Sequence, residues 1–135
     1  MYGGCFCGAI RYETNEPPFH ETTCHCSICR RTSGAPFVAW FSVPKGSFRF
    51  LKDTPTRFRS SAKGTRSFCP SCGTPLTCEL DDFPNEIDVT VCSLDHPEAV
   101  EPKDHTQTSS QLPWVKLADG LSSYRESRQE GEKTG

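Results

Sequence analysis

The sequence predicts a mainly β protein built from small antiparallel sheets, and three features of the chain indicate this fold class. Short runs of alternating apolar and polar residues recur along the chain, with turns rich in Gly and Pro between them. No stretch shows the sustained periodicity of a long amphipathic helix. Closely spaced cysteines lie between the runs, a pattern typical of metal cross-links.

The expected strands follow one another in chain order. Residues 9–13 alternate, with Ile10 and Tyr12 on one face, and the break at 15–18 ends this strand. Residues 36–43 and 47–51 are two further strands, and the turn between them predicts a hairpin. Four more strands are expected at residues 57–60, 65–68, 75–80 and 86–94.

One short helix is expected over residues 27–33, directly after Cys26, with Gly34 as its stop. Cys29 then lies in the first turn, where the partial positive charge of the helix favours a thiolate. Arg30 and Arg31 add to that positive field.

Length and charge limit the functions that the chain can have. The 135 residues suit one domain with a modest core, since 34% of them are hydrophobic. We expect this domain to span residues 1–125, and the polar residues 126–135 to form a disordered tail. The net charge of −2 argues against a nucleic-acid surface, and no apolar run is long enough to cross a membrane.

Nine cysteines in a chain of this size need an explanation. A disulfide scaffold is disfavoured because their number is odd, no secretory signal is recognisable and the cysteines are too closely spaced to bridge ordinary loops. Metal-bound thiolates in a reducing cytoplasm fit better. Iron–sulfur ligation remains the alternative to zinc.

Cys24, Cys26 and Cys29 supply three thiolates within six residues. Three protein ligands leave the fourth tetrahedral position of a zinc ion open, as in catalytic zinc sites. The alternative is a structural site with a fourth protein ligand, for which the candidates are His25, His20, Cys78 or a distant histidine.

A second set of thiolates comes from two distant segments. A closed structural site would combine Cys5 and Cys7 with Cys69 and Cys72, which would join the start of the chain to its middle. The glycines after each pair, Gly8 and Gly73, suit the positive φ that such turns need. The alternative is four buried core thiols.

The remaining candidates have weaker signals. Cys78 and Cys92 are expected in the core. Arg30 either binds a substrate carboxylate or forms a structural ion pair, and Trp114 either packs on the sheets or forms a substrate wall. His105 has no local partner that indicates a catalytic base.

These residues resemble the glutathione-dependent formaldehyde-activating enzyme (GFA) family, which also includes centromere protein V. The resemblance covers residues 3–125, and it is carried by Gly4-Cys5-x-Cys7-Gly8-x-Ile10-x-Tyr12, Cys24-His25-Cys26-x-x-Cys29-Arg30 and Phe68-Cys69-x-x-Cys72-Gly73. It implies a β-tent, in which stacked sheets are closed by zinc. It also implies a structural zinc on Cys5, Cys7, Cys69 and Cys72, and a reactive zinc on Cys24, Cys26 and Cys29.

The activity implied by the resemblance is that of a zinc-dependent carbon–sulfur lyase. Formaldehyde and glutathione would combine to S-hydroxymethylglutathione, or a related thiol adduct would be the substrate. A different class, also suggested by centromere protein V, is a non-catalytic, zinc-stabilised binding module. The coordination of the second site distinguishes them, because a fourth protein ligand would favour the module.

Overall fold

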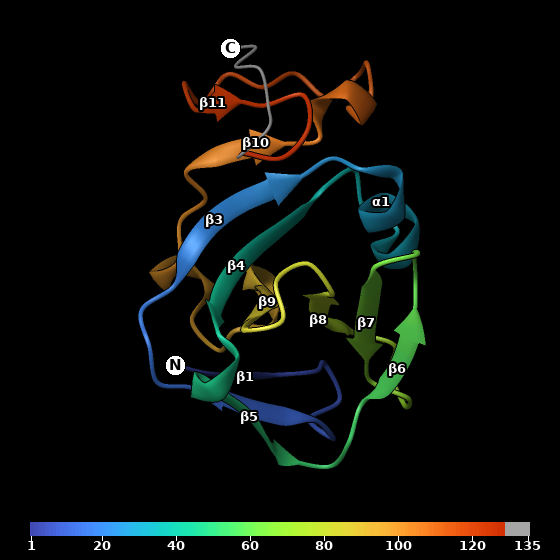
Figure 1. Ribbon diagram of the computed structural model, residues 1–135, viewed down its shortest axis with the longest axis vertical. Helices are drawn as coiled ribbons and strands as arrows, with labels where there is room; N and C mark the ends of the chain where they lie inside the picture. Colours follow the sequence, from blue (N-terminus) through green and yellow to red (C-terminus); the bar gives the residue numbers. More distant parts are fainter. Residues whose placement is uncertain (129–135) are drawn as a thin grey trace.

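The computed structural model describes residues 1–128, which form a mainly β fold with two sheets (Figure 1). The small antiparallel sheet has the order β1–β2–β5, and its strands are β1 (Tyr2–Gly4), β2 (Arg11–Thr14) and β5 (Phe48–Lys52). The large sheet has the order β11–β10–β3–β4–β9–β8–β7–β6. Its strands are β11 (Ser122–Ser123), β10 (Asp104–Thr106), β3 (Phe19–Cys24), β4 (Val38–Pro44), β9 (Glu86–Thr90), β8 (Pro75–Leu80), β7 (Gly64–Phe68) and β6 (Thr56–Arg59). The predicted fold class of small, mainly antiparallel sheets is therefore confirmed.

The large sheet is antiparallel from β3 to β6, whereas β10 runs parallel to both of its neighbours, β3 and β11. Within the described residues, four single turns of 3-10 helix connect the strands: η1 (Lys45–Ser47), η2 (Val91–Ser93), η3 (Pro97–Ala99) and η4 (Thr108–Ser110). Figure 1 shows the small sheet at one end of the molecule and β10 with β11 at the other. None of the helices within residues 1–128 is both long enough and apolar enough to cross a membrane.

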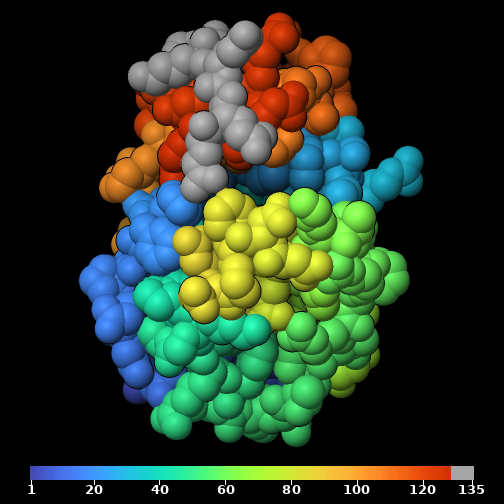
Figure 2. Space-filling model, in the orientation of Figure 1, coloured from blue at the N-terminus to red at the C-terminus, as the bar shows by residue number. Residues whose placement is uncertain are grey.

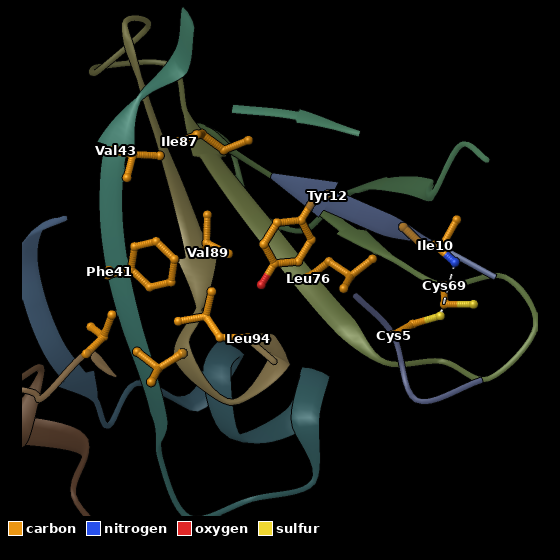
Figure 3. Packing of buried hydrophobic residues seen from close by; sticks show 12 residues of the cluster. Cys5, Ile10, Tyr12, Phe41, Val43, Cys69, Leu76, Ile87, Val89 and Leu94 are labelled. Atoms are coloured by element: carbon orange, nitrogen blue, oxygen red, sulfur yellow. Dashed lines mark hydrogen bonds between the residues drawn. The ribbon is translucent and has the colours of Figure 1, made fainter. Parts of the chain in front are cut away.

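The main core lies between the small sheet and one face of the large sheet. Ile10 and Tyr12 of the small-sheet side meet Phe41 and Val43 of β4 and Val89 of β9, and all five are buried (Figure 3). Alternation along β9 sends Ile87 and Val89 into this core and leaves Asp88 on the opposite face. The side of the large sheet that carries Asp88 is therefore free to build a site.

The helix α1 spans Ser27–Ser33, as predicted, and its ends follow from local chemistry. The sulfur of Cys26 caps the first turn by accepting a hydrogen bond from the Cys29 backbone N–H at 3.3 Å. Gly34 ends the helix in the left-handed conformation, with φ of 72°.

The predicted hairpin of residues 36–43 and 47–51 is wrong. Strand β4 pairs with β3 and β9, whereas β5 pairs with β2 in the small sheet. The turn η1 redirects the chain between them, and the ring of Phe48 then stacks on Tyr12 with centroids 5.1 Å apart. Packing on the core thus outweighs pairing with the sequence neighbour.

Two further expectations concern the ends of elements. The strand expected at 86–94 ends at Thr90, because η2 begins at Val91, and this turn leaves Cys92 exposed instead of in the core. Of the tail expected over 126–135, residues 129–135 lie outside the described residues. The Glu126 carbonyl accepts a hydrogen bond from the Gln107 N–H at 3.0 Å, and Arg128 forms an ion pair with Asp104.

Candidate metal centres and the cavity beside them

The four cysteines of the expected structural site lie together at one edge of the core. The sulfur atoms of Cys5, Cys7, Cys69 and Cys72 are all within 4.8 Å of one another. The Cys7 sulfur lies 3.6 Å from that of Cys5 and 3.8 Å from that of Cys69, although 62 residues separate Cys7 from Cys69. Four thiols of this spacing match the closed tetrahedral donor set of structural zinc.

Two tight turns bring these sulfurs into position. Gly8 and Gly73 have φ of 80° and 82°, and each donates its N–H to the carbonyl of the first cysteine of its pair. The Ile10 N–H points at the Cys5 sulfur at 3.2 Å, and the Cys72 N–H points at the Cys69 sulfur at 3.5 Å. N–H groups aimed at sulfur stabilise thiolates, the form that binds metal. The sequence predicted both glycine turns.

The second cluster lies where β3 leads into α1. The sulfur atoms of Cys24, Cys26 and Cys29 also lie within 4.8 Å of one another. Hydrogen bonds from the other two thiols lower the pKa of Cys26 to about 2, and the hydrogen bonds of Cys24 with the same cluster raise the pKa of Cys24. The three sulfurs thus share protons unevenly, because like charges this close cannot all form without a cation.

Within residues 1–128, no fourth His, Cys, Asp or Glu joins this second cluster. His20 and Cys78 line the cavity described below, and neither belongs to the group of three. A zinc ion held by Cys24, Cys26 and Cys29 would therefore keep one coordination position for a small molecule.

His25 lies between two of these cysteines but is completely buried in a separate polar cluster. Its Nε2 atom is 3.3 Å from the Thr23 hydroxyl and 3.4 Å from Nδ1 of His105, and His105 Nε2 is 2.8 Å from the Asp119 carboxylate. Burial lowers the pKa of His25 to about 4. No signal in the sequence indicated this cluster, because its residues come from three segments that are far apart in the chain: 23–25, 105 and 119.

The Arg30 side chain is likewise engaged in hydrogen bonds within the protein. Its guanidinium donates to the backbone carbonyls of His25, at 3.0 Å, and of Ser110. Trp114 is 67% exposed. Neither side chain is among those that line the cavity beside the second cluster.

A cavity of about 400 Å³ opens directly beside Cys24, Cys26 and Cys29. Apolar side chains such as Ile28, Trp40, Leu80 and Phe83 form much of its wall. Three segments meet around it: β3, the β6–β7 connection and the β8–β9 connection. Figure 2 shows them side by side on this face of the molecule, in blue, green and yellow.

The floor of the cavity is a row of side chains across the large sheet. Register places Ser42 of β4 opposite Asp88 of β9, Asp88 opposite Cys78 of β8, and Cys78 opposite Arg66 of β7. Residues directly opposite in antiparallel strands share a face, so all four side chains lie on the cavity side. Cys78 is buried, as predicted.

Arg66 and Asp88 are cavity residues that sequence reasoning missed. Alternation along residues 86–90 places Asp88 and Thr90 on one face of a strand and Ile87 and Val89 on the other. It could not indicate that this face borders a cavity, since that depends on the register of four strands.

These features define a class of small β domains with two separate cysteine clusters. One cluster lies at the edge of the core, and the other lies beside a cavity. The model of the family described as glutathione-dependent formaldehyde-activating enzyme matches residues 1–110. The chain therefore belongs to this family.

Two curated proteins and one solved structure are similar to parts of the chain. An uncharacterized lyase of Schizosaccharomyces pombe is 34% identical over 76 residues, which are 55% of this chain and 53% of that protein. A Halomonas elongata protein named as a putative glutathione-dependent formaldehyde-activating enzyme is 48% identical over 35 residues, which are 25% of this chain and 22% of that protein. The matches thus span about half of the first relative and about a fifth of the second. A crystal structure of a Rhodobacter sphaeroides protein has a TM-score of 0.60 and 26% identity, and the match covers 70% of this chain and 88% of that one.

Proposed function

We propose that this protein is a zinc-dependent carbon–sulfur lyase that joins formaldehyde to the thiol of glutathione, or acts on a closely related thiol adduct, and catalyses the reverse cleavage. The observation that carries the proposal is the position of Cys24, Cys26 and Cys29 in the wall of the cavity. The names of the family and of the Halomonas elongata relative support the substrate class.

The two clusters fit two different roles in this proposal. Cys5, Cys7, Cys69 and Cys72 would hold a structural zinc, because four thiols complete its coordination. Cys24, Cys26 and Cys29 would hold the reactive zinc. When bound there, zinc supplies a Lewis acid that lowers the pKa of a coordinated thiol and polarises a carbonyl group.

The residues around the second cluster suit a small anionic thiol. Arg66 places a guanidinium beside the cluster, with its Nη2 atom 3.5 Å from the Cys29 sulfur, and can bind a thiolate or carboxylate. The apolar wall that includes Trp40 and Phe83 limits water around the reacting atoms. We propose a reducing, cytoplasmic setting, because the thiolates must stay reduced to bind metal.

The alternative of a non-catalytic module would need a fourth protein ligand at the second cluster. The described part of the chain brings three such ligands together there and a cavity beside them. We therefore favour the enzyme.

Metal analysis together with a rate measurement tests this proposal. Protein purified without chelator should carry about two zinc ions by native mass spectrometry, one of them lost more easily. This form should accelerate S-hydroxymethylglutathione formation above the spontaneous rate, followed by NMR. Bound iron, or a fully zinc-loaded protein without any acceleration, would contradict the proposal.

A further inference from the structure

Asp88 occupies an unusual place for a carboxylate. It lies on β9, which has β4 on one side and β8 on the other, in the interior of the large sheet. Aspartate is disfavoured inside strands, and burying its charge lowers stability unless partners compensate. A carboxylate kept at such a position is a candidate for function.

Its partners compensate only in part. The Ser42 hydroxyl donates a hydrogen bond to Oδ1 of Asp88 at 2.6 Å. Across residues 1–128, the Asp88 side chain has no other hydrogen bond and no ion pair. Asp88 also lines the cavity, so one of its oxygens can reach a small molecule there.

The charged and titratable groups around Asp88 come from four strands. They are Glu86 on β9 itself, His20 on β3, Cys78 on β8 and Arg66 on β7. The pKa of Asp88 is raised to about 6, chiefly by burial. The hydrogen bond from Ser42 lowers this pKa, as do the charges of His20 and Arg66, whereas the charge of Glu86 raises it. A carboxyl group in this range can both take up and give back a proton near neutral pH.

Asp88 and Arg66 stand on either side of Cys78 in the row that forms the cavity floor, and all three side chains line the cavity. The two residues are two strands apart in one row, which is roughly 10 Å across a sheet. Arg66 contacts the Cys29 sulfur at the end of this row away from Asp88. A small thiol adduct in the cavity would thus lie between the cysteine cluster and the Asp88 carboxylate.

We propose that Asp88 is the acid–base residue of this site, and that its carboxylate takes the proton of the substrate thiol and returns it to the aldehyde oxygen. This role rests on the proposed function. The carbon–sulfur bond forms while the carbonyl π bond breaks, and its electron pair goes to oxygen. The proton that leaves sulfur goes to Asp88 and then to that oxygen, so Asp88 ends as a carboxylate. The reverse cleavage uses the same steps backwards.

The test compares wild type with Asp88→Asn, both loaded with zinc, at pH values from about 5 to 8, a range that brackets proton transfer by a carboxyl group near neutral pH. Asparagine keeps the size of the side chain and can still accept the bond from Ser42. We expect Asp88→Asn to lower the rate above background by about 100-fold or more and to remove the acid limb of the pH profile. Asp88→Glu should restore part of the rate.

Two matched variants separate this role from a general effect of charge. Asp82→Asn removes an exposed carboxylate outside the cavity and should keep both the rate and the pH profile. Glu86→Gln removes a negative charge that raises the Asp88 pKa, so the acid limb should move to lower pH. The carboxyl carbon of Asp88, followed by ¹³C NMR, should titrate near pH 6 in wild type and lower in Glu86→Gln.

Each result has a distinct meaning. An active wild type with an equally active Asp88→Asn variant of unchanged pH profile would overturn the role of Asp88 and leave the proposed function intact. So would an Asp88 carboxyl that titrates at the ordinary value for aspartate. A zinc-loaded wild type without catalysis would overturn the proposed function, and with it this role.

Discussion

Arg66 and Cys29 are 37 residues apart in the sequence, yet Nη2 of Arg66 lies 3.5 Å from the sulfur of Cys29. The same guanidinium lies over the ring of Trp40, 5.5 Å from its centroid, and donates to the Thr32 hydroxyl at 3.3 Å. Its buried Nε has no hydrogen-bond partner, and no carboxylate within residues 1–128 pairs with Arg66. Strand β7 thus places the Arg66 guanidinium, with an unpaired Nε–H group, beside the second cysteine cluster.

Replacing Arg66 with lysine should weaken catalysis. Lysine keeps the charge but loses the planar fork that reaches Cys29 and Thr32 together while stacking on Trp40. Loss of one hydrogen bond to a charged group costs about 1.5–3 kcal/mol, so kcat/KM should fall about 10- to 100-fold.

Arg57→Lys is the matched control for that measurement. Arg57 lies on β6, next to β7, where it pairs with Glu79 at 2.7 Å on the surface. This variant should keep kcat/KM near wild type. Equal values for Arg66→Lys and Arg57→Lys would show that the guanidinium of Arg66 plays no part in the reaction.

Asp88→Asn should stabilise the protein at neutral pH, even though we expect it to lower the catalytic rate. The pKa of Asp88 is about 6 in the folded protein, because of burial, and its ordinary value of 3.8 applies to the unfolded chain. Between pH 3.8 and about 6, Asp88 is therefore protonated in the folded protein and ionised in the unfolded chain. The free energy of unfolding falls as pH rises through this window. The asparagine side chain does not titrate, so the free energy of unfolding of the variant should exceed that of wild type by about 3 kcal/mol at neutral pH, and this difference should shrink as the medium becomes acidic.

Denaturant unfolding of both proteins, from about pH 4 to about pH 7, measures this difference across the window between the two pKa values. Loss of metal at low pH affects both proteins alike, so the difference between them reports on Asp88. A gain that stays constant with pH would mean that Asp88 does not have a raised pKa.

Local signals explain what the sequence predicted well. The helix Ser27–Ser33 was predicted with its bounds, because its stop is the adjacent Gly34. The close spacing within each segment predicted the cysteine ligands, and the combination of Cys5 and Cys7 with Cys69 and Cys72 was inferred; the structure brings Cys7 to within 3.8 Å of Cys69. These features depend on a few neighbouring residues and on the preference of thiolates for metals.

Features that depend on distant strand pairs were not predictable in this way. The row of Ser42, Asp88, Cys78 and Arg66 arises from three strand registers at once. The pairing of β5 with β2 reflects packing of aromatic rings in the core, which the turn at η1 does not encode. In the same way, the Asp119 carboxylate reaches the buried His105 because the chain folds back after β10, and β11 then pairs with β10.

Gly73→Ala should destabilise the fold through the backbone alone. Gly73 has φ of 82°, and a Cβ atom there would meet no atom within 4 Å. The left-handed conformation costs alanine about 1 kcal/mol or more, so the free energy of unfolding should fall by about 1 kcal/mol. Gly46 has the same open space without a positive φ, so Gly46→Ala should be neutral or slightly stabilising. Equal effects of the two substitutions in denaturant unfolding would contradict this explanation.

The clearest separation of the two cysteine clusters comes from Cys72→Ser and Cys26→Ser. A structural zinc contributes about 10–16 kcal/mol, which is comparable to the whole stability of a small domain, so Cys72→Ser should leave the protein unfolded. Cys26→Ser should stay folded, because serine can replace the Cys26 sulfur as the cap of α1. It should lose one zinc ion and most of the catalytic rate.

Circular dichroism, native mass spectrometry and the rate of adduct formation measure these effects on the same samples. A mild chelator applied to wild type should reproduce the Cys26→Ser state first, since three thiolates hold a metal less firmly than four. Unfolding should follow only when the zinc on Cys5, Cys7, Cys69 and Cys72 also leaves. If Cys26→Ser kept full activity, Cys24, Cys26 and Cys29 would not hold the reactive metal. If Cys72→Ser stayed folded, packing in the core around Tyr12 and Phe41, and not zinc, would hold the start of the chain against its middle.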